Sequence, residues 1–425
     1  MNKTSVLLGL IIGITLLFLT AQARALSPET EVLLELLQAK GVINKDDAAQ
    51  FRKTIEERMV ASGKIDAAGP EHQQKSAQGV SERLEKLEKG IKEGPLGPVA
   101  EKVRLSGFAK AEGNYTATDG AVPGTVASNS SDLTLADAEL DVDVTINDYV
   151  SGHLAFLYQE DDTEQVTVDE GIISISGKDN NPFALHVGKM YVPFGRFETR
   201  FISDPLTLLL GETGQTAVLG SYTDSLFETT LGVFNGDIDE TGTNNNVRSY
   251  VASAAFTLPE ATMPDFGLTA GASYISNIAD TDRMGDTGTG NGVLAATIND
   301  PVGGASVFVQ LSYLEKYFLD AEYVAAVEEF GFGELGANFI DTATKRYQPR
   351  TWNIELAYAL TEKLDIAGRY EGSDDFESIH PENQYGAAIL YTLFDNTTLT
   401  LEYLYGDFRN NDTRNSLTTQ LAIYF

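Results

Sequence analysis

From residue 103 to the end of the chain, apolar and polar side chains alternate with a period of two. In the segment 136–146, apolar residues at even positions alternate with Asp137, Glu139, Asp141 and Asp143 at odd positions. Successive side chains of a β-strand point to opposite faces, so one face of this segment is apolar and the other acidic. A row of carboxylates needs water, which a dry sandwich core does not supply. We therefore predict strands with one wet face and one apolar face.

The last nine residues, 417–425, repeat this pattern. Leu421 and Ile423 share one face with Phe425, and Thr418 and Gln420 lie on the other. A terminal aromatic residue after many similar segments is typical of the closing strand of a bacterial outer-membrane barrel. We interpret Phe425 as a signal to the barrel-assembly machinery. The alternative is an edge strand of a soluble all-β domain.

Short and long polar connections alternate between the predicted strands. The short ones are 147–148, 177–182, 223–225, 258–265, 314–317, 361–363 and 395–396. The long ones are 118–131, 160–165, 193–215, 236–247, 278–303, 329–348, 374–382 and 409–414. This alternation predicts an all-β transmembrane barrel of about sixteen antiparallel strands over 103–425, with a water-filled bore and lipid outside. The segment 292–304 could add a strand or form a hairpin within a loop.

The amino terminus predicts export. Lys3 precedes an apolar run over 6–19, and small residues at 21, 23 and 25 offer cleavage sites, so residues 1–25 are predicted to be a secretory signal peptide cleaved after Ala25. The alternative is a retained anchor, but a run of about 14 residues is shorter than the roughly 20 that span a bilayer.

Residues 26–102 show helical patterns. Residues 26–78 predict a periplasmic helical hairpin, which begins at Ser27 and Pro28, followed by a linker. Apolar residues at spacings of four, three and four predict a short coiled coil over 79–102. This part could tether the barrel to the periplasm or join three barrels in a homotrimer. Alternatively, its last helix packs under its own barrel.

Composition narrows the function. The chain has 425 residues, with 62 acidic against 30 basic side chains and a formal net charge of -32, which argues against nucleic acid as a partner. Cysteine is absent, so thiol catalysis and Cys-based zinc sites are excluded. The mean hydropathy of -0.14 suits a barrel, in which only alternate residues contact lipid.

Charged residues opposite the apolar rows are predicted to line the lumen. They are Arg104, Lys110, Asp137, Glu139, Asp141, Asp143, Asp320, Glu322, Glu355, Asp365, Arg369, Glu371 and Glu402. Because carboxylates outnumber the cationic groups, we expect a preference for cations or neutral chelates over phosphate-type anions, which need a basic constriction.

The loop 193–215 has about 23 residues, a length that is unusual without a function. In porins such a loop can fold into the bore and narrow it, where charges of both signs orient solutes. The candidate constriction residues are Lys189, Arg196, Arg200, Asp204 and Glu212. The alternative is an external loop that shields the rim.

Several short motifs surround this loop. They are Val168-Asp-Glu170, Val192-Pro-Phe-Gly195, Ser203-Asp-Pro-Leu206, Gly211-Glu-Thr213 and Phe234-Asn-Gly-Asp237. With the signal peptide and the helical segment, they cover most of the chain, which resembles the LbtU-type siderophore porins of Gram-negative bacteria. The resemblance implies an outer-membrane barrel associated with uptake of an iron-siderophore complex. It supplies no ligand residues.

Catalytic and cofactor chemistry is not indicated. His72, His153, His186 and His380 show no metal-ligand spacing, so we predict no metal and no cofactor. The pair Ser151 and His153 is typical of barrel lipases in spacing only, and its order is reversed, so we predict no enzyme.

Three functions remain. The first is an outer-membrane channel for passive uptake of a small hydrophilic solute, an iron-siderophore complex by the resemblance, since the helical segment is too short for the plug of an energy-coupled receptor. The second is a general cation-preferring porin. The third is a structural tether between the outer membrane and the cell wall.

Overall fold

The computed structural model describes residues 102–120, 128–160, 165–177, 181–242, 246–259, 261–287 and 292–425. The chain divides into compact units 1–91 and 92–425, and all described residues belong to the second. The predicted signal peptide, helical hairpin and nearly all of the predicted coiled coil lie outside the described residues.

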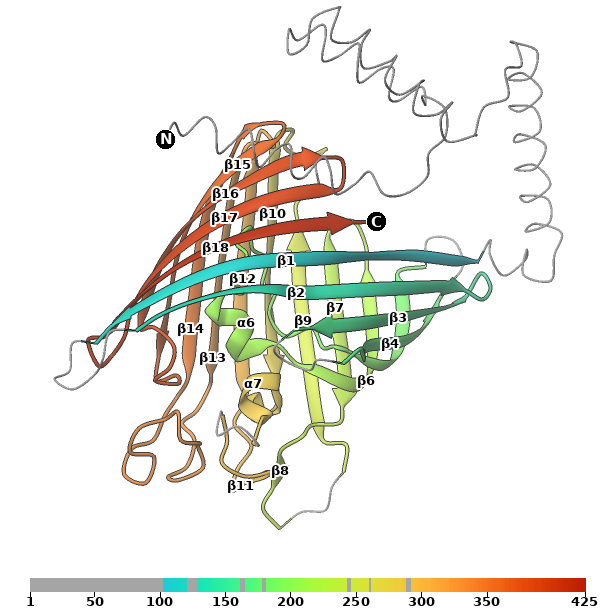
Figure 1. Ribbon diagram of the computed structural model, residues 1–425. Coiled ribbons are helices and arrows are strands. Elements are labelled where there is room, and N and C mark those ends of the chain that lie inside the picture. Colours follow the sequence, from blue (N-terminus) through green and yellow to red (C-terminus); the bar gives the residue numbers. More distant parts are fainter. Residues whose placement is uncertain are drawn as a thin grey trace, which may run out of the picture. The chain divides into compact units, whose positions relative to one another are not determined.

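Sixteen antiparallel strands close into one barrel, which confirms the predicted fold (Figure 1). The strands are β1 Val103–Asp119, β2 Ser128–Thr145, β3 Val150–Gln159, β4 Thr167–Ser176, β5 Phe183–Tyr191, β6 Gly214–Thr223, β7 Phe227–Phe234, β9 Ser249–Thr257, β10 Phe266–Ile275, β12 Gly304–Tyr313, β13 Tyr317–Ala326, β14 Arg350–Thr361, β15 Leu364–Asp374, β16 Asn383–Phe394, β17 Thr397–Asp407 and β18 Thr413–Tyr424.

The first and last strands close the ring. β1 pairs with β18 from Phe108↔Tyr424 to Asp119↔Thr413. The backbone groups of Gly107 and Phe425 exchange two further hydrogen bonds, each of 3.0 Å. A side chain at position 107 would place its Cβ 2.2 Å from the carbonyl oxygen of Glu139 on β2, so the close approach of β1 to β2 requires glycine there.

The predicted alternation of faces holds along most of each strand. Leu140 and Leu356 are exposed on the outer surface, at 41% and 58%. One correction concerns Ala136, which we predicted in the outward row. The pairing of β1 with β2 passes from Lys110↔Asp137 to Ala111↔Leu135, so Ala136 is the extra residue of a β-bulge. A bulge shifts the alternation by one residue, which a strict period of two does not anticipate.

Long and short connections emerge at opposite ends of the barrel, which we call the loop end and the turn end (Figure 1). The segment 292–304 adds no strand to the barrel. Within it, β11 Thr297–Ile298 pairs in parallel with β8 Asp239–Glu240 of another long loop. The segment is therefore part of a contact between loops.

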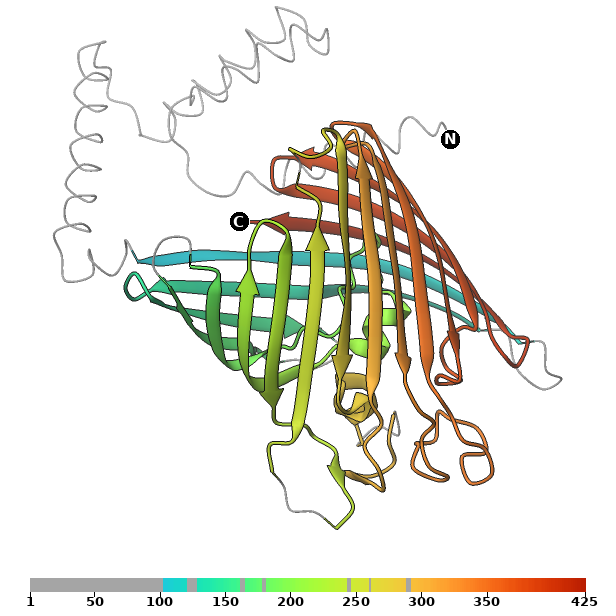
Figure 2. The ribbon, with the colours of Figure 1, turned by 180° about the vertical axis from the view of Figure 1, so that it is seen from behind.

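Part of the loop end is packed rather than water-filled. The helices α6 Leu206–Gly211, η1 Ile278–Asp280 and α7 Asp282–Gly285 lie in connections at this end, and α6 is seen inside the ring of strands (Figure 2). Inward residues such as Met190, Leu219 and Val324 form one hydrophobic cluster with loop residues such as Leu210 and Met284. The prediction of an open bore is therefore wrong for this part of the interior.

Among the described residues, no helix is long and apolar enough to span a membrane.

The two faces of β2 should respond differently to the same charge. We expect Leu140→Arg to place a cation in hydrocarbon and to destabilise the barrel by about 2–4 kcal/mol. The neighbouring Asp141→Arg should be tolerated, because its side chain enters the lumen. The measurement is the folded fraction in lipid vesicles, followed by gel mobility without heating. Equal loss of folding in both variants would contradict the assignment of faces.

Candidate functional site

The connection between β5 and β6, residues 192–213, is the centre of the candidate site, and we call it the inner loop. Its first residues turn the chain into the barrel. Gly195 adopts a φ of +92° and Phe197 a φ of 54°. A Cβ on Gly195 would meet the Phe197 ring, so the turn requires glycine. Phe194, only 1% exposed, packs into the hydrophobic cluster at the loop end and fixes the point of entry.

Carboxylates on the barrel wall hold the backbone of the inner loop. Glu322 of β13 accepts hydrogen bonds from the backbone N–H groups of residues 196 and 197, at 2.8 and 3.0 Å. One carboxylate oxygen of Glu402 on β17 accepts those of residues 202 and 203, at 2.7 and 3.0 Å. These N–H groups have no partner within a sheet or helix, so the wall satisfies them.

Two more carboxylates continue the same contact. Glu355 of β14 accepts hydrogen bonds from the Arg200 backbone N–H and the Thr199 hydroxyl, both at 2.8 Å. Glu371 of β15 accepts one from the Leu206 backbone N–H at 2.7 Å, where α6 begins. The inner loop is therefore attached to the wall along most of its length, and it lies inside the barrel.

Arg369 holds the inner loop at Ser203. Its guanidinium donates to the Ser203 carbonyl at 2.8 Å and to the Ser203 hydroxyl at 2.6 Å, and it forms an ion pair of 3.2 Å with Glu371. The Phe201 ring lies 4.3 Å from this guanidinium. The same ring packs on a small apolar patch of the wall, made of Ala357, Ala367, Ala388 and Leu404.

These contacts correct part of the predicted lumen lining. Glu355, Glu371 and Glu402 are at most 1% exposed, and Glu322 and Arg369 are 8% and 3% exposed. They are buried beneath the inner loop and are not exposed to the open part of the lumen. The physical reason is that an extended loop inside a barrel needs hydrogen-bond acceptors for its backbone, and inward carboxylates provide them.

Charged side chains of alternating sign follow one another along the inner loop at Arg196, Glu198 and Arg200. The guanidinium carbon of Arg196 lies 5.7 Å from the Phe308 ring centre, and a guanidinium nitrogen lies 3.6 Å from the Glu228 carboxylate. Arg200 has the same arrangement. Its guanidinium carbon lies 4.1 Å from the Phe318 ring centre, and the guanidinium forms an ion pair of 3.1 Å with Asp320. Both arginines are thus held between an aromatic ring and a carboxylate of the wall.

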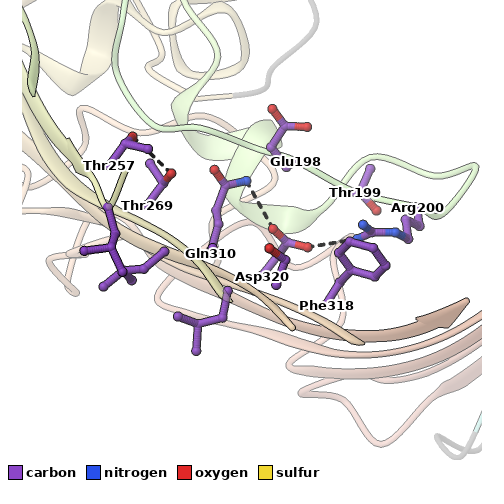
Figure 3. Close-up of a pocket in the computed structure, with 13 residues that line it drawn as sticks. Glu198, Thr199, Arg200, Thr257, Thr269, Gln310, Phe318 and Asp320 are labelled. Atoms are coloured by element: carbon purple, nitrogen blue, oxygen red, sulfur yellow. Dashed lines mark hydrogen bonds and ion pairs between the residues drawn. The ribbon is translucent and has the colours of Figure 1, made fainter. Parts of the chain in front are cut away.

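A cavity of about 420 Å³ opens beside the tip of the inner loop (Figure 3). One side is the tip, with Glu198, Thr199 and Arg200. The other is the wall of β9, β10, β12 and β13, where a polar residue of each strand stands in register: Thr257, Thr269, Gln310 and Asp320. The two threonine hydroxyls are 3.1 Å apart, and Gln310 donates to Asp320 at 3.1 Å.

The inward face of β1 to β4 carries an acidic surface. Among the residues that the structure describes, no hydrogen bond or ion pair joins this surface to the inner loop. Lys110 pairs with Asp137 at 3.1 Å, and Arg104 pairs with Asp143 at 3.2 Å. A His153 ring nitrogen lies 2.9 Å from the Asp143 carboxylate. We call this surface the acidic wall, and its charged residues are Arg104, Lys110, Asp137, Glu139, Asp141, Asp143, His153 and Glu170.

The remaining predicted residues lie in different places. Lys189 shares its face of β5 with the outward Leu185 and Val187, and its ammonium donates to the Val168 carbonyl at 3.0 Å. The prediction that Lys189 joins the constriction is therefore wrong, because strand alternation turns it outward. Asp365 lies on the inward face of β15, in register with Leu390 of β16. A role of Phe425 in assembly stays a prediction.

Two acidic residues of the inner loop have raised pKa values. Burial raises the pKa of the Asp204 carboxyl, with a smaller contribution from the nearby Asp137. Burial, reinforced by Asp282 and Asp204, raises the pKa of Glu212 to about 7. Glu212 therefore gains its negative charge near neutral pH, unlike an exposed glutamate.

Some residues of the site were not predicted. Glu228, Gln310 and Thr269 occupy inward positions, and extending the alternation strand by strand would have found them. Phe308 and Phe318 lie under the two arginines, but in the sequence they look like members of an aromatic belt. Within the described residues, no three His, Asp or Glu side chains converge on a point that could hold a metal ion.

The chain has sequence relatives among known proteins. No family model matches the chain. The chain is similar to a UPF0422 protein of Coxiella burnetii, 24% identical over 332 residues, which cover 76% of this chain and 67% of that protein. A UPF0422 protein of Legionella pneumophila is 24% identical over 293 residues, 64% of this chain and 54% of the relative. This chain therefore spans about half of the Legionella protein.

Among solved structures, the chain is similar to an anion-selective porin from Comamonas acidovorans. The TM-score is 0.50 at 10% sequence identity, and the match covers 76% of this chain and 99% of the porin. The likeness shows that residues of the described barrel adopt the porin fold.

Removing one wall carboxylate should loosen the inner loop. Glu402→Ala leaves two backbone N–H groups without their acceptor, each hydrogen bond to a charged group being worth about 1.5–3 kcal/mol. We expect a larger and noisier single-channel conductance, with an intermediate effect for Glu402→Gln, which keeps one acceptor oxygen. Glu362→Ala, in the exposed turn between β14 and β15, is the matched control. An unchanged conductance in Glu402→Ala would show that the anchor is dispensable.

Glu212 should make ion selectivity depend on pH. Because its pKa is about 7, the carboxyl is neutral at pH 5.5 and charged at pH 8.5. Selectivity for K⁺ over Cl⁻ should therefore rise over this interval, and Glu212→Gln should flatten the rise. Reversal potentials recorded at both pH values test this. Identical pH profiles of the variant and the parent protein would exclude Glu212 as the source.

Proposed function

We propose that this chain is an outer-membrane channel through which small hydrophilic solutes pass passively. The observation that carries the proposal is the arrangement inside a closed porin-type barrel. A loop attached to β13, β14, β15 and β17 narrows the lumen, while the acidic wall on β1 to β4 remains polar. The apolar outer surface, with residues such as Leu356 and Leu140, suits contact with lipid.

The distribution of charge supports a preference for cations. After the buried carboxylates are set aside, the acidic wall still has more carboxylates than cationic groups, and Glu198 and Glu228 add to them. Arg196 and Arg200 are each paired with a carboxylate. The positive groups at the constriction are thus partly neutralised, so the local field favours cations and neutral solutes. The anion selectivity of the Comamonas porin does not carry over with the fold, because selectivity depends on these side chains.

The proposal also includes the identity of the solute. The resemblance to LbtU-type siderophore porins supports an iron-siderophore complex, and a neutral or cationic chelate would agree with the acidic lumen. A general cation-preferring porin has the same architecture and differs in the range of solutes. We propose no catalytic role for Ser151 and His153, since the His153 ring faces Asp143, Asp141 and Glu170.

Partners and location follow from the same proposal. The barrel would be inserted in the bacterial outer membrane by the barrel-assembly machinery, with lipid around it and residues 26–102 in the periplasm. A homotrimer stays part of the proposal. A tether function would depend on residues 26–102, and deleting residues 26–100 would then abolish function while leaving conductance intact.

Ion selectivity in planar bilayers tests the channel. With a tenfold KCl gradient across the membrane, the purified protein should give a reversal potential of the sign that indicates K⁺ preference. A preference for Cl⁻ would overturn the assignment of the acidic wall to the water-filled lumen. Absence of any conductance would reject the channel itself.

Growth measurements test the solute. Cells supplied with a siderophore as the sole iron source should grow more slowly when the gene is deleted, and growth should return when it is restored. If growth is unaffected while general nutrient uptake falls, the general porin is the correct function.

A further inference from the structure

We propose that the cavity beside the tip of the inner loop is a binding site for a solute that has a net positive charge carried by a protonated amine, and that Glu198 determines this specificity. The proposal rests on the channel function proposed above and adds a solute class to it. The cavity volume of about 420 Å³ lies near the lower end of the range of pockets that bind small molecules.

One of the carboxylates that line the cavity has no ion-pair partner among the described residues. Arg200 and Asp320 pair with each other at 3.1 Å, and Arg200 also lies over the Phe318 ring, so neither ion is available without breaking a contact. Glu198 is exposed and has no hydrogen-bond or ion-pair partner among the described residues. Its carboxylate is turned away from Asp320 and stands at the edge of the cavity (Figure 3).

The polar groups of the wall offer hydrogen-bond acceptors. Gln310 gives one of its two amide N–H groups to Asp320, and its carbonyl oxygen faces the side of Thr269. One of the Thr257 and Thr269 hydroxyls donates to the other at 3.1 Å, and both oxygens retain acceptor lone pairs. A ligand that donates hydrogen bonds can use these oxygens, and one that also satisfies Glu198 must be positively charged. A primary ammonium group on a small polar body meets both conditions.

The residues beside Glu198 explain why the charge is held in place. The flanking Arg196 and Arg200 point toward the wall and are fixed over Phe308 and Phe318. The backbone on both sides is tied to Glu322 and Glu355. Glu198 therefore sits on a rigid segment and needs little reorganisation to receive a cation.

The rate of liposome swelling tests the proposal with lysine and glutamine as probes. They are similar in size and both carry an α-ammonium and an α-carboxylate, but only lysine has a side-chain ammonium and a net positive charge. The parent protein should admit lysine about threefold faster than glutamine. In Glu198→Gln the ratio should fall to about one. Glu362→Gln, which removes an exposed carboxylate outside the cavity, should keep the parent ratio.

A second variant separates the cavity from a general field effect. Thr269→Val removes one wall hydroxyl and no charge, and should slow lysine while leaving KCl conductance unchanged. If Glu198→Gln and Glu362→Gln lower the lysine preference equally, or if neither Glu198→Gln nor Thr269→Val changes it, the cavity is not the site. If no solute enters with the parent protein, the channel function fails first.

Discussion

The structure depends on how a barrel accommodates an extended loop in its interior. Backbone N–H groups that leave a sheet still need acceptors, and an unpaired group away from water costs free energy comparable to a lost hydrogen bond. Here the acceptors are glutamates on the inward face of β13, β14, β15 and β17, each placed opposite a particular stretch of the inner loop. The residues of the wall strands therefore determine the position of the constriction as much as the residues of the loop do.

This arrangement divides the inward carboxylates into two groups. The carboxylates under the inner loop do not interact with a solute, because they are buried and accept hydrogen bonds from backbone N–H groups. Those on the acidic wall and around the cavity remain in the polar part of the lumen and set its field. A count of inward charges overstates the charge that a passing solute meets. The charge of the lumen is reduced further by two ion pairs, in which Arg196 is paired with Glu228 and Arg200 with Asp320.

Much of the fold could be predicted from the sequence, because period-two alternation and the lengths of connections depend on local chemistry. The exceptions also have local causes. Ala136 is the extra residue of a bulge, and 292–304 pairs with another loop instead of joining the barrel. The site was harder to predict. Inward positions such as Glu402 were correctly placed on their face, but their burial depends on where a distant loop folds. Glu198 and its cavity depend on contacts between five separate segments.

The central claim is that the inner loop covers one side of the wall and leaves the acidic wall in water. The chain has no cysteine, so single cysteines can be introduced and labelled with a membrane-impermeant thiol reagent. Asp141→Cys lies on the acidic wall, and Ala388→Cys lies beneath the Phe201 ring, where the native alanine is 2% exposed. The account predicts fast labelling at position 141 and slow labelling at position 388. Equal rates at the two positions would contradict it.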